Sequence, residues 1–206
     1  MPPRGVLISM TSIYLVRHGI TQANKENRFA GRTAEGLHSD GVEQIRQVGS
    51  RLHEKNIGGI FCGPLPRTVQ SAEILQDMLH VPQTVVEGFN EIKIPHWDGL
   101  TKYEIRQQHG GEYPTWRAEP QIFELSGCET IKKVQERAVS AIKFIAAGHP
   151  GENVLLVSHL IVLRSLVLYY RDMDIRDFRS IKIDNGAILC LSEAADGQMK
   201  IEELGN

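Results

Sequence analysis

The sequence predicts an α/β fold of three layers, α/β/α, in which helices cover both faces of a mostly parallel central sheet. Short runs rich in β-branched residues alternate with longer segments of helical periodicity, which is typical of strands joined by helical crossovers. The run "NVLLV" at 153–157 is apolar after its first residue, as expected for a strand buried on both faces. The 206 residues suffice for one domain with a sizeable core.

The first half of the chain alternates between the two kinds of element. We expect, in order, strand Ser12–Val16, helix Ser39–Glu54, strand Gly59–Cys62, helix Leu65–Leu79 and strand Thr84–Glu87. Ser39-Asp40 followed by Glu43 forms a capping pattern at the start of the first helix. Pro66 falls in the first turn of the second helix, where a missing backbone N–H is tolerated.

The second half begins irregularly and then returns to alternation. Residues 91–127 hold three prolines, so we expect an irregular cap segment with a helical fragment near Lys102–His109. The further elements expected are helix Glu129–Ala147, strand Asn153–Val157, helix Leu160–Tyr169 and strands near Ile181, at Ala187–Leu191 and at Lys200–Glu202. The aliphatic stretch Leu166–Tyr170 fits a dimer contact as well as a core.

The domain organisation is predicted to be simple. No internal repeat or long linker is visible, so residues 1–206 are interpreted as one domain. Residues 1–10 have the character of a flexible tail without a signal peptide's long apolar region, and either Met1 or Met10 fits as the natural start.

Composition narrows the function classes. The net charge is −2 and the basic residues are spread out, which argues against binding to nucleic acid or to a membrane surface. The three cysteines are odd in number and far apart, which favours a reduced, cytoplasmic compartment. We therefore expect a cytoplasmic protein whose partner is a small molecule.

Arginine and histidine residues follow several of the predicted strands. The first strand ends in Arg17-His18-Gly19, Arg67 follows the second, and His159 follows the run at 153–157. In open parallel sheets, sites form outside the carboxyl ends of the strands. Two arginines, two histidines and Glu91, which follows the third strand, are therefore expected to converge on one pocket. Helix N-termini would add positive potential there, so the pocket suits a phosphoryl group.

Four segments occur in the order of the signature blocks of a known family. They are "LVRHGITQAN", "GPLPRTVQSAE", "NEIKIPHWDGL" and "LLVSHLIVLRSL". With these blocks the chain resembles the histidine phosphatase superfamily, the phosphoglycerate-mutase-like proteins, from about Ile13 to Gly186. The resemblance implies a phosphoglycerate-mutase-like fold and catalysis without a metal ion or another cofactor.

The resemblance also implies a role for each matching residue. His18 would attack phosphorus and become a phosphohistidine, while Arg17, Arg67 and His159 would hold the phosphoryl oxygens. Glu91 would protonate the leaving alkoxide and later deprotonate the attacking water. Further candidates for substrate contacts are Asn24, Thr21, Gly31, Lys102 and His96.

Each residue also has an ordinary explanation when it is taken alone. A histidine or a carboxylate after a strand is usually a solvated loop residue, and only the joint pattern favours a site. The remaining histidines, which show no metal-ligand spacing, are interpreted mostly as surface residues: His38, His53, His80, His96, His109 and His149. Of these, only His96 is close in sequence to the pocket residues, and a packing role suits it better than substrate binding.

The resemblance leaves more than one function open. Members of the mutase branch carry a longer middle segment with an arginine pair, whereas Arg106 and Arg117 are isolated here. The blocks resemble the metal-independent phosphoserine phosphatases and the α-ribazole phosphatases more than the mutases. We therefore favour a phosphomonoesterase acting on a small phosphorylated metabolite. The alternatives are a cofactor-dependent phosphoglycerate mutase and a non-catalytic module that binds a phosphorylated ligand.

Overall fold

A six-stranded sheet forms the centre of the protein. The computed structural model describes residues 11–193 and 198–204, so the tail expected at 1–10 lies outside the described residues. The strands follow the spatial order β3-β2-β4-β1-β5-β6. Their bounds are β1 Ser12–Arg17, β2 Ile57–Cys62, β3 Gln83–Val85, β4 Asn153–Ser158, β5 Ile188–Glu193 and β6 Met199–Glu203.

Seven α-helices of the described residues connect and cover the strands. They are α1 Gln22–Lys25, α2 Ser39–Leu52, α3 Pro66–Leu79, α4 Lys102–Gln108, α5 Glu112–Ala118, α6 Ile131–Gly148 and α7 Leu160–Tyr170. Short 3₁₀ turns complete the list: η1 His53–Lys55, η2 Glu87–Phe89, η3 Pro95–Trp97, η4 Pro120–Ile122 and η5 Ile175–Arg179. Within residues 11–193 and 198–204, no helix combines the length and the apolar character needed to cross a bilayer.

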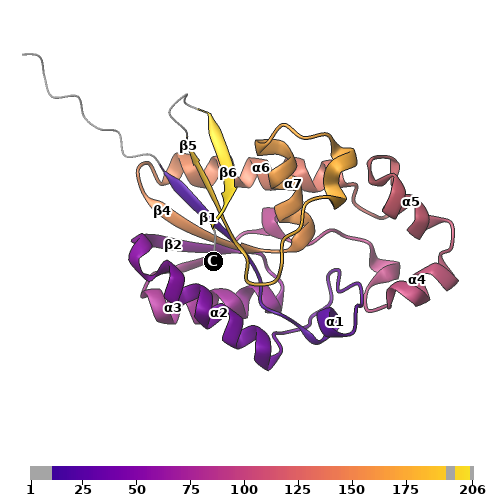
Figure 1. Cartoon of the computed structure of the whole chain (residues 1–206), viewed down its shortest axis with the longest axis horizontal. Coiled ribbons are helices and arrows are strands. Elements are labelled where there is room, and N and C mark those ends of the chain that lie inside the picture. Colours follow the sequence, from indigo (N-terminus) through magenta and orange to yellow (C-terminus); the bar gives the residue numbers. More distant parts are fainter. Residues whose placement is uncertain (1–10, 194–197, 205–206) are drawn as a thin grey trace, which may run out of the picture.

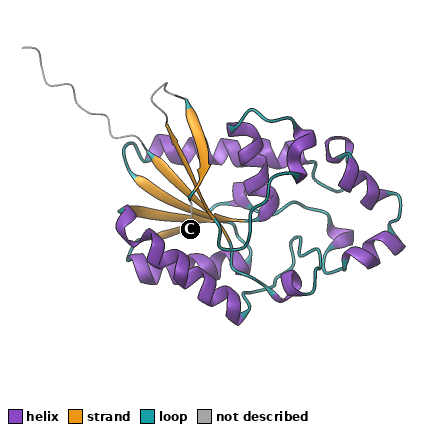
Figure 2. Cartoon of the chain, in the orientation of Figure 1, coloured by secondary structure: helices purple, strands orange, loops and turns teal. Residues whose placement is uncertain are grey.

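The predicted three-layer, mostly parallel architecture is confirmed (Figures 1 and 2). Strands β1 to β4 run parallel, and only β5 and β6 are antiparallel additions at one edge. Alternate residues of β1 face opposite sides of the sheet. Ile13 and Leu15 belong to the cluster packed by α6 and α7, whereas Tyr14 and Val16 belong to the cluster packed by α2 and α3.

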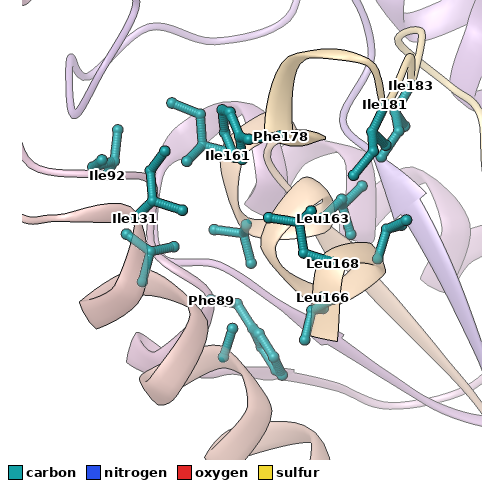
Figure 3. Packing of buried hydrophobic residues seen from close by; sticks show 14 of the residues in the cluster. Phe89, Ile92, Ile131, Ile161, Leu163, Leu166, Leu168, Phe178, Ile181 and Ile183 are labelled. Atoms are coloured by element: carbon teal, nitrogen blue, oxygen red, sulfur yellow. The ribbon is translucent and has the colours of Figure 1, made fainter. Parts of the chain in front are cut away.

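The larger cluster extends from the sheet into the middle segment of the chain. Its members come from α6, α7 and the irregular segments near them, as Figure 3 shows for Phe89, Ile131 and Phe178. Leu166 and Leu168 lie within it and are 0% and 1% exposed. These leucines are therefore core residues, whereas Tyr169 of the same stretch is exposed, and a dimer contact there stays a prediction.

Three elements differ from expectation, each for a local reason. Helix α2 is capped by His38, whose Nδ1 accepts the Asp40 N–H at 3.1 Å, so Ser39 is already its first residue. Helix α5 forms despite Pro114, because proline there falls in the first turn, where N–H groups lack helical partners. Ile181 lies in a loop and not in a strand; its apolar neighbourhood reflects packing of Ile181 and Ile183 on the core.

The loop after β1 packs closely against the start of α2. A Cβ atom added to Gly19 would lie 2.3 Å from the carbonyl oxygen of Gly41, with two more backbone atoms under 3.0 Å. We expect Gly19→Ala to lower the free energy of unfolding by about 2–3 kcal/mol, because backbone cannot give way as a side chain can. Urea denaturation checks this value. Gly148→Ala, where nothing lies within 4 Å, is the control, and equal losses in both variants would contradict the packing argument.

Candidate active site

One pocket of about 370 Å³ gathers most of the predicted site residues. It lies at the carboxyl ends of β1 and β4, on the side of the molecule where α1, α4 and α5 are found (Figure 1). The site residues predicted from the sequence that line it are Arg17, His18, Asn24, Gly31, Arg67, Glu91 and Lys102. Segments far apart in the chain therefore meet at one point, as the strand-end pattern predicted.

His18 is held in the form that a nucleophile needs. Its Nδ1 lies 2.8 Å from the carbonyl oxygen of Gly19. A carbonyl only accepts, so Nδ1 carries the hydrogen and Nε2 keeps its lone pair toward the pocket. Burial, and after it the nearby Arg67 and Arg17, lower the pKa of His18 well below its usual value. The imidazole is therefore neutral at pH 7.

His159 lies beside His18, as the strand-end pattern predicted. The centroids of the two rings are 5.3 Å apart and their planes are inclined by 61°. His159 is 0% exposed, and neither of its ring nitrogens has a hydrogen-bond partner among the described residues. Burial and then Arg67 lower its pKa well below the usual value. A buried imidazole without a hydrogen-bond partner beside His18 is suited to contact a phosphoryl oxygen.

Arg17 and Arg67 are fixed to the backbone in similar ways. Arg17 donates from Nη1 to the Ile183 carbonyl at 2.7 Å, and Arg67 donates from Nη2 to the Gly31 carbonyl at 2.6 Å. Within the described residues, the Nε–H of each arginine is buried and has no acceptor. Burial lowers the pKa of Arg17 to about 10, so both guanidinium groups stay charged at pH 7. The two arginines thus present fixed positive charge to the pocket.

Glu91 is a buried carboxyl group at the wall of the pocket. Its Oε1 accepts the Ile92 N–H at 2.8 Å, which leaves Oε2 as the oxygen that can carry a proton. Burial raises the pKa of Glu91, and this effect outweighs the opposing hydrogen bond and the nearby arginines. A raised pKa is what a carboxyl group needs in order to act as an acid near neutral pH.

An ion-pair network that the sequence did not reveal positions Glu91. Its backbone carbonyl accepts from Arg32 Nε at 2.8 Å and from Arg137 Nη2 at 3.2 Å. Glu129 joins the same two arginines, at 2.8 Å to Arg32 and 2.9 Å to Arg137. Apart from the Glu129–Arg137 pair, whose residues are 8 positions apart, the contacts join residues 46 to 97 positions apart, so no local pattern could have indicated the network.

Asn24 and Asn185 form a hydrogen-bonded contact between residues that are far apart in the chain. Asn185 Nδ2 donates to the His18 carbonyl at 2.9 Å and to Asn24 Oδ1 at 3.1 Å. Asn24 Oδ1 also accepts the Thr21 N–H, so the amide nitrogen of Asn24 remains for a ligand. Thr21 is fully buried as the N-cap of α1 and does not line the pocket. Asn185 does line the pocket. It was not among the residues predicted from the sequence, although it follows the strand expected near Ile181.

Gly31 and Lys102 lie at the pocket as predicted. Gly31 adopts a φ of +47°, and a Cβ atom there would overlap the Asp98 carboxylate, so the close approach requires glycine. Lys102 donates to Asn27 Oδ1 at the rim. Their contacts with substrate stay predictions.

His96 belongs to a different cluster. Its Nε2 lies 2.6 Å from Glu112 Oε2, which also accepts the Trp97 Nε1–H at 3.1 Å, and His96 does not line the pocket. Ligand atoms of His96, His109 and Glu112 lie within 4.8 Å of one another. The expectation that the histidines show no metal-ligand spacing concerned the sequence; the fold brings these two histidines and Glu112 together.

Comparison with known proteins places this geometry in a family. The family model "Histidine phosphatase superfamily (branch 1)" matches residues 13–206. The chain belongs to the histidine phosphatase superfamily. The resemblance inferred from the four blocks is thereby confirmed, and the coarse assignment as a phosphatase of this superfamily is supported by several relatives.

Among its relatives, histidine phosphatases and a mutase both occur. The chain is 24% identical over 178 residues to "Phosphoserine phosphatase 1" of Hydrogenobacter thermophilus, covering 86% of this chain and 84% of that protein. It is 30% identical over 162 residues to "Probable phosphoglycerate mutase GpmB" of Salmonella choleraesuis, covering 77% and 74%. The solved structure "Bacillus stearothermophilus YhfR" has a TM-score of 0.90 and 27% identity, covering 95% and 97% of the two chains.

The buried histidines make stability depend on pH. Their pKa values are lowered from 6.5 in the folded protein, so below that pH the unfolded chain binds up to two more protons. The free energy of unfolding should therefore decrease as the pH is lowered below 6.5, by up to about 1.4 kcal/mol per pH unit for each histidine. The raised pKa of Glu91 has the opposite effect, since it stabilises the fold as pH falls toward 4.5.

Urea denaturation between pH 5 and 7.5 measures this dependence. We expect His159→Gln to reduce the slope of the free energy of unfolding against pH by the amount that corresponds to about one proton. The control His53→Gln, which removes an exposed imidazole, should leave this slope unchanged. An undiminished slope in His159→Gln would show that this imidazole is protonated in the folded state.

Proposed function

We propose that the protein is a phosphomonoesterase that hydrolyses a small phosphorylated metabolite through a phosphohistidine on His18. The observation that carries the proposal is the neutral His18, with Nε2 free, near three side chains that hold buried nitrogens without a partner among the described residues. These nitrogens are Nε of Arg17, Nε of Arg67 and both ring nitrogens of His159. Such groups, fixed before substrate arrives, stabilise the charge that develops during phosphoryl transfer.

The first step of the proposed reaction transfers the phosphoryl group to the enzyme. His18 Nε2 forms a bond to phosphorus as the bond between phosphorus and the ester oxygen breaks. Glu91 gives its proton to the leaving alkoxide, which its raised pKa allows. The guanidinium groups of Arg17 and Arg67, which are planar and permanently charged, neutralise the equatorial oxygens of the phosphoryl group.

The second step returns the enzyme to its starting state. Glu91, now a carboxylate, removes a proton from water as that water attacks phosphorus and the bond to His18 breaks. Inorganic phosphate leaves, and Glu91 is again protonated. The network of Arg32, Glu129 and Arg137 supports both steps by fixing the backbone of Glu91.

A phosphoglycerate mutase is the second candidate, and two observations favour it. Lys102 lines the pocket, and a relative at 30% identity carries a mutase name. Against it, neither Arg106 nor Arg117 lines the pocket, and Arg106 stacks on Tyr113 with its guanidinium carbon 5.2 Å from the ring centroid. Residues 91–127, the segment that carries the arginine pair in the mutase branch, thus place no arginine in the pocket, and hydrolysis is the better proposal. Arg164 and Arg179, which do line the pocket, lie outside that segment.

Assays with small phosphate esters and with 3-phosphoglycerate distinguish these functions. We expect phosphate release from several esters and no efficient conversion of 3-phosphoglycerate to 2-phosphoglycerate, with or without 2,3-bisphosphoglycerate. Efficient interconversion without phosphate release would establish the mutase instead. A protein that binds phosphate esters but releases no phosphate would support a non-catalytic binding module.

Chelation tests the proposal that the arginines alone supply the positive charge. Because Arg17 and Arg67 line the pocket and His159 lies beside His18, we expect excess EDTA to leave kcat unchanged. Phosphate release before and after dialysis against EDTA measures this. A large loss that added Mg²⁺ or Zn²⁺ restores would mean that the reaction requires a metal ion.

We also propose that the protein acts in the cytoplasm. The three cysteines are free thiols, and burial raises the pKa of the Cys62 thiol to about 11, so it is unreactive. Fractionation with antibody detection tests this, and recovery in a secreted or membrane fraction would contradict it.

A further inference from the structure

The pocket holds more positive charge than one phosphoryl group needs. Glu91 is the single carboxylate among the described residues that line it. The cationic side chains that line it are six: Arg17, Arg28, Arg67, Lys102, Arg164 and Arg179. A phosphoryl group carries a charge of about −1.5 to −2 at pH 7, which Arg17 and Arg67 match. The other four cations therefore need a separate explanation.

Arg28 is explained by its ion pairs. Its Nε lies 2.6 Å from Glu26 and its Nη1 lies 3.5 Å from Glu104. In the part of the chain that the structure describes, no ion pair joins Lys102, Arg164 or Arg179 to a carboxylate. Arg164 and Arg179 are half-buried and Lys102 is exposed, and none of the three has a carboxylate as an ion-pair partner there.

Arg164 and Arg179 are each held by a hydrogen bond to a backbone carbonyl and by contact with an aromatic ring. Arg164 Nε donates to the Ile181 carbonyl at 2.7 Å, and its guanidinium carbon lies 5.4 Å from the centroid of the Phe178 ring. Arg179 donates to the Trp116 carbonyl from Nε at 3.3 Å and Nη2 at 3.2 Å, with its guanidinium carbon 5.5 Å from the Trp116 ring centroid. Arginines fixed in this way lose little entropy when they bind an anion.

The three cations also repel one another. Burial and then Arg179 lower the pKa of Arg164 to about 10. Burial, and after it Arg117 and Arg179, lower the pKa of Lys102. Like charges gathered without a counter-charge destabilise a fold, and an anion bound among them would relieve that cost.

The wall beside these cations is aromatic. Tyr113 and Trp116 from α5 and Phe178 from η5 line the same pocket. Aromatic faces can cover the carbon skeleton of a ligand whose charged groups lie at its ends. The pocket therefore presents a phosphoryl site, an apolar wall and a second positive region.

We propose that Arg164, Arg179 and Lys102 form a second anion subsite, and that the substrate is a phosphate ester bearing a second anionic group, a carboxylate or another phosphate. This inference rests on the proposed phosphatase function and narrows its substrate class. It assigns to Arg164 and Arg179 a role in specificity that the four sequence blocks do not indicate.

Pairs of esters that differ only in the second group test the inference. For a carboxylate, kcat/KM for 3-phosphoglycerate is compared with that for glycerol 3-phosphate, which has a hydroxymethyl group instead. For a second phosphate, fructose 1,6-bisphosphate is compared with fructose 1-phosphate. We expect the wild type to prefer the doubly acidic ester at least about tenfold in one pair or both, which identifies the anion.

Variants connect that preference to the proposed residues. We expect Arg179→Gln and Arg164→Gln each to reduce the kcat/KM ratio of the preferred pair by about fivefold to tenfold. The ratio does not depend on the amount of folded enzyme, because both esters are measured on the same sample. Arg117→Gln is the matched control: it removes an exposed positive charge near Lys102 that does not line the pocket, and it should leave the ratio unchanged.

The outcomes separate this inference from the proposed function. If p-nitrophenyl phosphate is hydrolysed in a His18-dependent manner while both ratios are near one, the phosphatase stands and the second subsite is refuted. An equal fall of the ratio in Arg117→Gln would mean that only general electrostatics act, and would also refute it. If no ester is hydrolysed, the proposed function fails and the inference fails with it.

Discussion

Replacing His18 with alanine is expected to abolish phosphate release, with a loss of kcat on the order of 10⁵–10⁶. The variant lacks the nitrogen that would accept the phosphoryl group, and its neighbours have other roles in the proposed reaction: His159 contacts a phosphoryl oxygen, and Glu91 acts as the acid. Stopped assays of phosphate release from p-nitrophenyl phosphate measure the loss. Its size makes it the largest effect expected from a single substitution.

The His18→Ala variant should remain folded. The side chain makes one hydrogen bond, to the carbonyl of the next residue, so its removal leaves no distant group without a partner. Circular dichroism and urea denaturation check this, and His53→Ala, which removes an exposed imidazole, should keep wild-type activity. A folded His18→Ala variant with more than a few per cent of wild-type kcat would exclude His18 as the nucleophile.

Glu91→Gln should impair esters according to their leaving groups. Glutamine has nearly the same shape but cannot donate the proton that an alkoxide needs. For an alkyl ester such as glycerol 3-phosphate we expect kcat/KM to fall about 10²–10⁴-fold. For p-nitrophenyl phosphate the fall should be much smaller, because p-nitrophenolate leaves without a proton, and kcat/KM reports the steps up to phosphoryl transfer.

The comparison between the two esters is the decisive part of this experiment. Glu87→Gln changes another carboxylate of the same segment, one that accepts from Asn90 Nδ2 at 3.2 Å, and serves as the control. Equal losses for both esters in Glu91→Gln would indicate a general disturbance of the pocket. An alkyl ester hydrolysed at the wild-type rate would show that Glu91 is not the acid.

The sequence predicted the architecture well because local patterns determine most of it. Strand β1 and helix α7 were predicted to within one residue, since an apolar run and a change of period mark them clearly. Helix α5 was missed because Pro114 was taken as a sign of irregular structure. The strand expected near Ile181 was wrong because alternating apolar residues also occur in a loop that packs on a core.

Most of the site residues predicted from the sequence line the pocket, but Asn185, Arg164 and Arg179 line it too and were not predicted. The residues that hold Glu91 in place were not predicted either. His18 and His159 follow strands, so the strand-end rule brought them together before any distance was known. Glu129 is joined to Glu91 through Arg32 and Arg137, and the contacts of Arg32 with these two residues span 97 and 59 positions, which leaves no mark in one sequence. The same holds for Arg164 and Arg179, whose positive charges are unpaired only in the folded chain.

Direct detection of the phosphoryl group on the enzyme tests the central claim. Glu91→Gln, in which hydrolysis of the intermediate should be slow, is mixed with p-nitrophenyl phosphate, quenched in alkali, digested and mapped by mass spectrometry. We predict one phosphoryl group on His18 in the peptide containing Arg17-His18-Gly19 and none in a His18→Ala/Glu91→Gln double variant. A phosphoryl group on any other residue, or unmodified protein during a burst of p-nitrophenol release, would contradict the account.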